Sequence, residues 1–416
     1  MGIELTTLPS GIRVVTEAVP GGRSVSAGVW VGVGARDEPA ELAGVSHFLE
    51  HLLFKGTAGR TAKQIAETVD RVGGDMNAFT AKEYTAYYTR LPASSGALAL
   101  DVLGDIATSP RLDDADVESE RQVILEELGM DEDAHDDRAH TLLYESLFPG
   151  HPLGRETAGE RATVEAITPD DVRSFFARWY RPANMVVSVA GAIEHADVVA
   201  QVRRAFGVTD EGDRPVRAAP VAAMRQLAVV RRSCEQVHLV LGFRGFDRDD
   251  PGREALDIMN HVLGGGMSSR LFDEIREKRG LAYSVYSGTA SYADAGALAI
   301  YAGTSPGQVD AVLDLVDLEL DRLRADGITD DELDVARGYL TGSYVLGLED
   351  SGSRMSRNGA HVLARGAVRP VDEQISRYEA VTHDDVAKVI DRVLGGPRTL
   401  AAVGPVTKKA LAARAS

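Results

Sequence analysis

The chain has 416 residues, of which 44% are hydrophobic, and its formal net charge is -18. This length predicts two to four domains with cores of ordinary size, and the acidic balance argues against a nucleic-acid-binding protein, which would carry a basic face. Cys234 is the single cysteine, which excludes an intrachain disulfide and a zinc knuckle built from several thiolates. Neither an apolar run of about 18 residues nor a signal peptide is visible, which favours a soluble cytoplasmic protein with no membrane partner.

The first apolar run, residues 25–34, predicts a strand, and the histidine motif after it predicts a helix. His47-Phe-Leu-Glu50-His51 places two histidines four residues apart, so both imidazoles leave one face of the helix. Such a pair supplies two nitrogen ligands to one zinc ion. Glu50 lies beside the metal rather than on it, where it can take a proton from a water molecule. The alternative is a partly exposed helix with two unrelated histidines.

The next two segments, residues 62–72 and 77–88, predict a helix and a strand. The strand is rich in Phe, Thr and Tyr and follows Gly73-Gly74. A peptide added along the edge of such a strand would be held through its main chain, with broad tolerance for its sequence. The alternative is an ordinary edge strand that binds nothing.

An acidic helix predicted at residues 113–128 offers the third protein ligand that a hydrolytic zinc site requires. Glu120 and Glu127 are seven residues apart and therefore share a face, whereas Glu126 is rotated by about 100° from Glu127. One of the pair can bind the metal while the other orients a histidine. The alternative is a solvated acidic helix.

The second half of the chain repeats short sequence motifs of the first half. Arg-Asp-Glu-Pro at residues 36–39 returns as Arg-Asp-Asp-Pro at 248–251, and Thr-Pro-Asp-Asp-Val at 168–172 returns as Thr-His-Asp-Asp-Val at 382–386. The order is kept and the offset is nearly constant, which predicts an internal duplication.

Further elements extend the mixed pattern: strands are predicted at residues 185–191, 237–245 and 297–303, and a helix at 311–324. We therefore predict an α+β fold of two homologous domains, each a mostly antiparallel β-sheet packed with helices. The predicted boundaries are 1–209 for the zinc-bearing domain, 210–225 for a linker and 226–416 for the second domain. The second copy is predicted to hold no metal, because apolar Met259, Val262 and Leu263 stand where the first copy has its histidine motif.

Residues 44–57, 74–88 and 120–127 resemble the pitrilysin and mitochondrial processing peptidase family, whose zinc signature is an inverted His-x-x-Glu-His. The resemblance covers nearly the whole chain and is closest to the bacterial processing peptidase-like branch. It implies that Glu127 is the third zinc ligand and that Glu120 is a carboxylate that supports a ligand without binding the metal itself.

The same resemblance implies which residues bind substrate. Asn77, Ala78 and Phe79 match the edge strand that pairs with a peptide backbone. Arg276 and Tyr283 match an arginine and a tyrosine that grip the substrate and support the transition-state oxyanion.

The activity implied by the resemblance is that of a zinc endopeptidase, with one zinc per chain, acting on peptides or unfolded segments. Longer members of the family fuse two such halves into a clamshell. The resemblance therefore implies a homodimer, in which Arg276 and Tyr283 of one subunit complete the site of the other.

Two alternatives compete with this interpretation. One is a non-catalytic or partner-dependent core subunit of the same fold, although such members typically lose zinc ligands. The other is a ribosyl-homocysteine lyase, which shares the His-x-x-Glu-His motif but takes a cysteine as its third ligand. Cys234, the single cysteine, lies in the predicted metal-free half.

Overall fold

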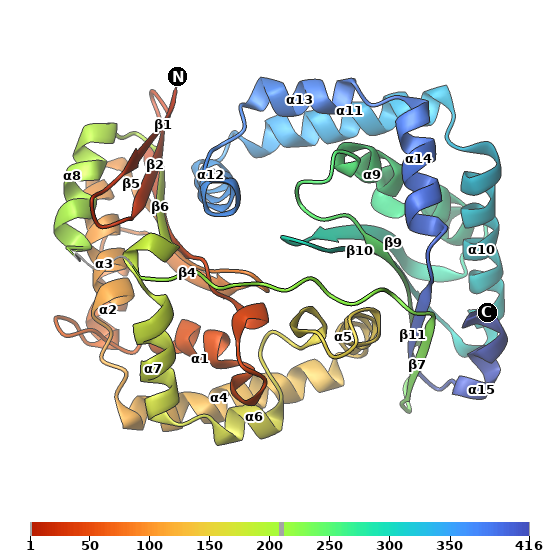
Figure 1. The fold of residues 1–416 in the computed structure, drawn as a ribbon, viewed down its shortest axis with the longest axis horizontal. Helices are drawn as coiled ribbons and strands as arrows, with labels where there is room; N and C mark the ends of the chain where they lie inside the picture. The colour runs from red at the N-terminus through yellow and green to blue at the C-terminus, as the bar shows by residue number, and fades with distance from the viewer. Residues whose placement is uncertain (1, 208–211, 416) are drawn as a thin grey trace. The chain divides into compact units, whose positions relative to one another are not determined.

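A computed structural model describes residues 2–207 and 212–415 (Figure 1). Packing divides the chain into two compact units: the first comprises Met1–Leu128, Arg155–Arg217 and Val345–Arg369, and the second comprises Gly129–Gly154, Ala218–Tyr344 and Pro370–Ser416. Each unit contains one sheet with helices, which confirms the predicted α+β fold. Of the predicted linker, residues 210 and 211 lie outside the described residues, and 212–225 contain neither helix nor strand.

The first unit is built from a six-stranded sheet and eight helices within the described residues. They are β1 (Ile3–Thr7), β2 (Arg13–Ala18), β3 (Ser24–Val31), α1 (Val45–Leu52), α2 (Ala62–Asp70), β4 (Asp75–Thr80), β5 (Thr85–Pro92), α3 (Gly96–Thr108), α4 (Asp114–Asp133), α6 (Arg161–Ala166), α7 (Pro169–Trp179), β6 (Met185–Gly191), α8 (His195–Ala205) and α12 (Ser351–Arg365). Helix α4 ends beyond the boundary of the unit at Leu128.

The second unit is built from a five-stranded sheet, its helices and two π-helical turns. They are α5 (His135–Leu147), β7 (Gln226–Arg231), β8 (Val237–Gly245), α9 (Arg253–Asn260), the π-turns His261–Gly265 and Phe272–Glu277, β9 (Ala282–Ser291), β10 (Gly296–Thr304), α10 (Val309–Asp326), α11 (Asp330–Gly347), α13 (Val371–Glu379), α14 (His383–Leu394), β11 (Thr399–Gly404) and α15 (Lys408–Leu411). Among the helices of the described residues, none is long and apolar enough to cross a membrane.

The two sheets share one topology, which is the structural counterpart of the predicted duplication. The strand order is β2-β6-β3-β5-β4 in the first sheet, which β1 extends beside β2, and β7-β11-β8-β10-β9 in the second. In both sheets the first of these pairs is parallel and the following pairs are antiparallel. Strands β4 and β9 hold the same place in this order, and each lies at an edge of its sheet.

The single strand predicted at residues 77–88 is wrong, because the chain reverses within it. Strands β4 and β5 pair antiparallel, and residues 81–84 form the turn between them. The Ala81 N–H donates to the Tyr84 carbonyl at 2.8 Å, and Glu83 in the turn accepts a hydrogen bond from Arg36 at 2.6 Å. The run of strand-forming residues gives no sign of this turn, because the turn is held by the hydrogen bond between Glu83 and Arg36, which is 47 residues away in the sequence.

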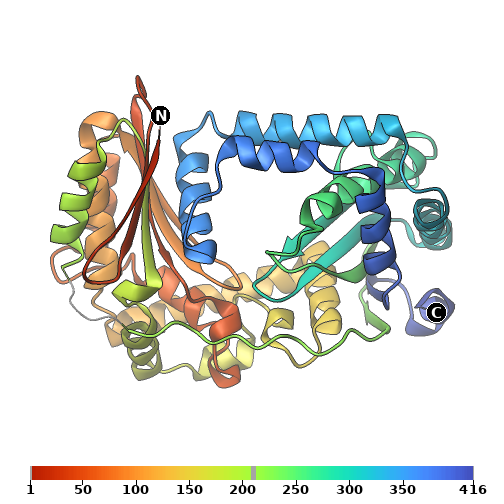
Figure 2. The same ribbon diagram turned by 45° about the horizontal axis from the view of Figure 1, so that its top comes forward.

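Each sheet is covered on one face by a helix from the other half of the sequence. Helix α12 packs on β2, β3 and β6 of the first unit, and α5 packs on β7, β8 and β11 of the second (Figures 1 and 2). The fit of α12 is close: a Cβ on Gly359 would lie 2.5 Å from Cε3 of the buried Trp30. The predicted domain boundaries describe the duplicated halves and stay a prediction, whereas packing assigns residues 129–154 to the second unit and 345–369 to the first.

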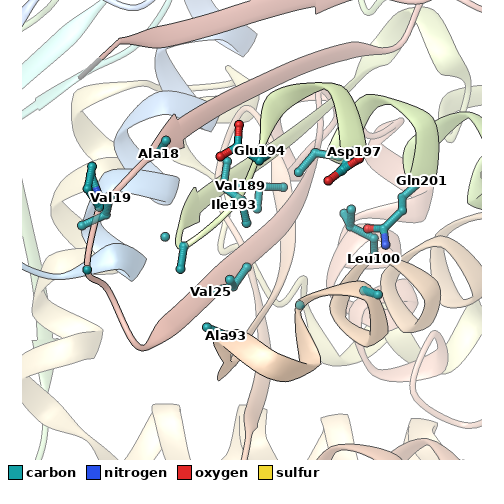
Figure 3. Close-up of a pocket in the computed structure, with 17 residues that line it drawn as sticks. Ala18, Val19, Val25, Ala93, Leu100, Val189, Ile193, Glu194, Asp197 and Gln201 are labelled. Carbon is teal, nitrogen blue, oxygen red and sulfur yellow. The ribbon is translucent and has the colours of Figure 1, made fainter.

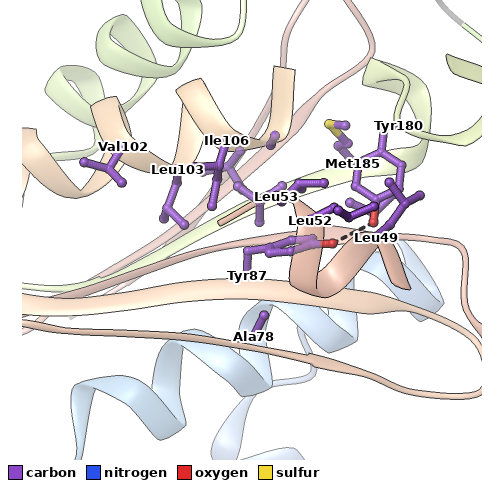
Figure 4. Packing of buried hydrophobic residues seen from close by; sticks show 14 of the residues in the cluster. Leu49, Leu52, Leu53, Ala78, Tyr87, Val102, Leu103, Ile106, Tyr180 and Met185 are labelled. Atoms are coloured by element: carbon purple, nitrogen blue, oxygen red, sulfur yellow. Dashed lines mark hydrogen bonds between the residues drawn. The ribbon is translucent and has the colours of Figure 1, made fainter. Parts of the chain in front are cut away.

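The main core of the first unit lies on the opposite face of its sheet and holds α1 in place. Leu49, Leu52 and Leu53 of this region are buried beside Tyr87 of β5 (Figure 4). The hydroxyl groups of Tyr87 and Tyr180 are hydrogen-bonded at 2.8 Å within this core, so the phenols are satisfied where water is excluded. The core thereby fixes the buried side of α1, and the polar residues of that helix lie on its other side.

Candidate metal centre

Helix α1 is preceded by a glycine, and a carboxylate six residues before that glycine binds the N–H groups at the start of the helix. Gly44 has φ 99°, a left-handed conformation that favours glycine, and a Cβ there would lie 2.6 Å from the Ala158 carbonyl oxygen. The buried carboxylate of Glu38 accepts hydrogen bonds from the N–H groups of Gly44 and Ser46, each at 2.7 Å. Burial raises the pKa of Glu38 to about 7, although these backbone donors act to lower it. Two of the unpaired N–H groups at the helix start are thus satisfied.

Helix α4 runs beside α1 and carries the two glutamates of the sequence prediction. Arg121 helps to dock it: its guanidinium lies 5.6 Å from the centroid of the Phe48 ring of α1 and donates to the Ile167 carbonyl at 2.7 Å. Glu120, on the same turn, is buried, and Glu127 is about one-third exposed. The adjacent Glu126 is exposed, as its rotation from Glu127 predicts.

The side chains of His47, His51 and Glu127 converge. Their ligand atoms all lie within 4.8 Å of one another, and no other such group of three occurs in residues 2–207 and 212–415. Glu127 Oε2 is 3.8 Å from His47 Nε2 and 3.4 Å from His51 Nε2. Ligands held tetrahedrally at about 2.0–2.1 Å from one zinc ion lie roughly 3.3 Å apart. The donor set therefore fits a single zinc ion, with small movements of the side chains.

The two histidines differ in how their second ring nitrogen is held. His51 Nδ1 lies 3.1 Å from Oε2 of Glu120, the carboxylate–histidine arrangement that orients a metal-binding imidazole. His47 Nδ1 is buried and has no hydrogen-bond partner in the described part of the chain. Burial, followed by the charge of His51, lowers the pKa of His47 to about 4, so this imidazole is neutral at pH 7, as a metal ligand must be.

The carboxylate of Glu50 is held by a hydrogen bond from Thr80 of β4, a residue that the sequence prediction did not include. The Thr80 hydroxyl donates to Glu50 Oε2 at 2.6 Å. Burial raises the pKa of Glu50, and the hydrogen bond from Thr80 acts to lower it. A buried carboxylate with a raised pKa is a better proton acceptor than an ordinary one. Glu50 therefore has the surroundings of a general base, on the same helix as the two histidines.

Strand β4 leads directly to this point through Thr80, its last residue. Of the three residues of β4 that are predicted to bind substrate, Asn77 and Phe79 are exposed and Ala78 is buried. Within the first unit β4 pairs with β5 alone, so its other edge can accept an added strand.

Arg276 and Tyr283 belong to the second unit, where they contact each other. The Arg276 guanidinium carbon lies 4.8 Å from the centroid of the Tyr283 ring. Tyr283 is 80% exposed at the start of the edge strand β9. The predicted pair is thus brought together on a surface, with the hydroxyl donor accessible.

The second copy of the fold has no metal-binding side chains at the corresponding positions. Met259, Val262 and Leu263 are buried in the core of the second unit, as is Ala336, which corresponds to Glu120. Buried core residues thus stand at these four positions, and the division into a metal-bearing and a metal-free half stays a prediction.

The first unit also has a pocket of about 480 Å³ apart from these residues (Figure 3). It lies beside the turn between β2 and β3, with mainly apolar walls such as Leu100 and Val189 and with Glu194 and Asp197 at its border. Its lining includes no residue of α1, α4 or β4, so the pocket is separate from the metal centre.

The sequence held only weak signs of the supporting residues. Glu38 carries no capping signal, because it lies six residues before the N-cap Gly44 and a capping residue stands immediately before its helix. Lys55 follows His51 by four residues, a spacing of neighbours on a helix. Nothing in the pattern around Thr80 relates it to Glu50, because that contact depends on how β4 lies beside α1.

Comparison with known proteins places the whole chain in one family. Residues 13–161 match the family model described as insulinase, peptidase family M16, and residues 166–340 match the model described as the peptidase M16 inactive domain. A protein of Streptomyces coelicolor named an uncharacterized zinc protease is 46% identical over 98% of this chain and 90% of its own length. One of Bacillus subtilis with the same description is 38% identical over 97% of this chain and 98% of its own.

A solved structure shows the same fold. The crystal structure of a protease from Helicobacter pylori superposes with a TM-score of 0.90 at 23% identity, over 97% of this chain and 99% of that one. The sequence matches confirm the family resemblance drawn from the histidine motif and the segments around it. This chain belongs to the insulinase family of peptidases, peptidase family M16.

Proposed function

We propose that this protein is a zinc-dependent endopeptidase that hydrolyses peptides or unfolded segments. The observation that carries the proposal is the convergence of His47, His51 and Glu127 from two helices, with Glu50 beside them. The names of the Streptomyces and Bacillus relatives support the choice of zinc and of peptide-bond hydrolysis. One zinc ion per chain agrees with the single group of three ligands in the described residues.

The mechanism follows from the positions of the side chains around the three ligands. Zinc bound there would supply Lewis-acid chemistry, lowering the pKa of a water molecule and polarising the scissile carbonyl. Glu50 accepts the proton of the attacking water on its carboxylate and returns it to the leaving amine. Thr80 holds the Glu50 carboxylate by its hydrogen bond, and Glu120 holds the ring of His51.

Substrate is expected to bind as an added strand along β4. Its free edge offers main-chain groups beside Asn77, Ala78 and Phe79, so affinity would depend on the peptide backbone more than on particular side chains. Such recognition suits flexible segments, because they are free to take up the extended conformation that pairing with β4 requires.

The complete site is proposed to require a homodimer. Arg276 and Tyr283 of one subunit would grip the substrate of the other, and the Tyr283 hydroxyl would donate to the oxyanion. The functional particle would then have about twice the mass of the 44.5 kDa chain. The cytoplasmic location, the processing peptidase-like branch and the clamshell arrangement of the dimer, which would form a chamber around the substrate, stay predictions from the sequence.

A non-catalytic or partner-dependent core subunit is the alternative. The family model that residues 166–340 match is described as an inactive domain. That segment, however, holds none of the four residues His47, Glu50, His51 and Glu127. Activity of the purified protein on its own would exclude this alternative.

Removal of zinc is expected to abolish hydrolysis, and its return to restore it. The purified protein should contain about one zinc per chain and digest an unstructured peptide such as reduced casein. A chelator should stop the digestion, and added zinc, but not magnesium, should restart it. His47→Ala should lose the metal while His383→Ala, at an exposed ion pair with Asp330, should keep it. A metal-free chain with full activity would refute the proposal.

Sharing of the site between subunits is expected to give complementation. Glu50→Gln chains and Tyr283→Phe chains should each be nearly inactive, but their mixed dimer has one site with both groups. After complete exchange, half of the dimers are mixed, so roughly one quarter of the wild-type rate should return. A chain with both substitutions, mixed with Glu50→Gln chains, is the control and should stay inactive. Verified exchange without a gain in rate would show that Tyr283 acts within its own chain or not at all.

A further inference from the structure

A lysine just after the metal helix contacts the carboxylate that orients His51. The ammonium group of Lys55 forms an ion pair with Oε1 of Glu120, while the other oxygen of Glu120, Oε2, faces His51 Nδ1 at 3.1 Å. In the described part of the chain, Lys55 and His51 are the partners of the Glu120 side chain. Each oxygen of this buried carboxylate therefore has one partner.

The backbone of Lys55 is held independently of its side chain. Its N–H donates to the Leu52 carbonyl at 3.1 Å, and its carbonyl accepts from Arg111 at 3.1 Å. The next residue, Gly56, is bridged to Thr61 and accepts at its carbonyl from the Arg111 N–H at 3.0 Å. The backbone of Lys55 is thus bound to the segment that leads into α4. Only the side chain of Lys55 needs to be ordered for its ammonium group to contact Glu120.

Charge explains why a cation is needed here. The centre gathers three carboxylates, those of Glu50, Glu120 and Glu127, within one partly buried cluster. A divalent ion offsets two of these charges, and Lys55 offsets the third. The side chain of Glu120 is only 5% exposed, and a buried carboxylate without a partner is strongly unfavourable.

We propose that Lys55 is a positioning residue for the metal centre: it fixes Glu120 and, through Glu120, the ring of His51. This inference rests on the proposed zinc function and adds a third residue to its chain of contacts, which runs from the ligand His51 to the carboxylate of Glu120 to Lys55. Lys55 reaches the metal only through the other two side chains, so its effect should be seen first in zinc affinity.

The test measures the zinc dissociation constant by competition with a chromophoric chelator. Loss of a group that supports a metal ligand typically weakens metal affinity by about 10–100-fold, and we expect Lys55→Met to fall in this range. Lys55→Arg, which keeps the cation, should recover most of the affinity. Lys63→Met is the matched control, because Lys63 forms an exposed pair with Glu67 on α2; its zinc affinity should equal that of the wild type.

A double variant separates the proposed chain of contacts from a general loss of stability. Glu120→Gln should also weaken zinc binding, but Lys55→Met should add nothing in the Glu120→Gln background, since the lysine then has no carboxylate to hold. Additive losses, or an unchanged constant in Lys55→Met, would overturn the inference while leaving the endopeptidase proposal intact. Wild-type protein that binds no zinc would instead refute the proposed function.

Discussion

Replacing Glu50 with glutamine is expected to lower kcat by about 10²–10⁴-fold, the usual contribution of a general base, while the zinc content stays at the wild-type level. Glutamine has the size of glutamate and keeps an oxygen that can accept from the Thr80 hydroxyl, which now donates at 2.6 Å. It lacks the carboxylate that is proposed to take the proton of water. Steady-state hydrolysis of a quenched fluorescent peptide, together with metal analysis of the same sample, measures both quantities.

The matched control is Glu126→Gln on α4. Glu126 is exposed and lies next to Glu127 in sequence, but it is not part of the group of three ligands, so kcat should not change. A Glu50→Gln protein that keeps zinc and hydrolyses the peptide at the wild-type rate would show that another group accepts the proton. Loss of zinc from this variant would assign Glu50 a role in metal binding instead.

The candidate metal centre divides into parts that the local sequence predicts and parts that it does not. The spacing of His47, Glu50 and His51 determines their directions, because a helix of eight residues fixes them relative to one another. Helix geometry also brings Glu120 and Glu127 to one face of α4. It does not say which of the two meets the histidines; the structure places Glu127 beside both Nε2 atoms and Glu120 at the far side of His51.

Contacts between distant segments could not be predicted in the same way. Thr80 reaches Glu50 only because β4 lies beside α1, and Lys55 reaches Glu120 only because α4 packs there. The exchange of α5 and α12 between the halves is a further case. Their sequences show ordinary amphipathic helices, and nothing in such a pattern states which of two similar sheets the apolar face will cover.

That exchange predicts that neither half of the chain folds alone. The fragment 1–217 lacks α12, whose Met355 and Val362 cover the buried Trp30. Fully burying each such side chain contributes about 1.5–3 kcal/mol, a large share of the stability of a domain. Polar groups lose partners as well: the buried carboxylate of Glu17 accepts from Asn358 Nδ2 at 2.8 Å. Expressed alone, this fragment should be aggregated or unfolded.

The fragment 218–416 meets the same difficulty, because it lacks α5. Leu143 of that helix is buried against β8, where a Cβ on Gly242 would lie 2.6 Å from Leu143 Cδ1. Without α5, the apolar side chains of Val240 and Val403 on this face of the sheet would be exposed. An exposed apolar sheet face of this kind favours aggregation, so this fragment should also fail by itself.

Produced together, the two fragments should form one particle of the mass of the intact chain, because each supplies the helix that the other requires. Size-exclusion chromatography and urea unfolding of the separate and joint fragments test this directly. The control is the intact chain with a protease site inserted after residue 217 and cut after folding, which should stay associated. A soluble, monomeric 1–217 fragment with a cooperative unfolding transition would contradict the prediction, since it would mean that the first sheet is stable without α12.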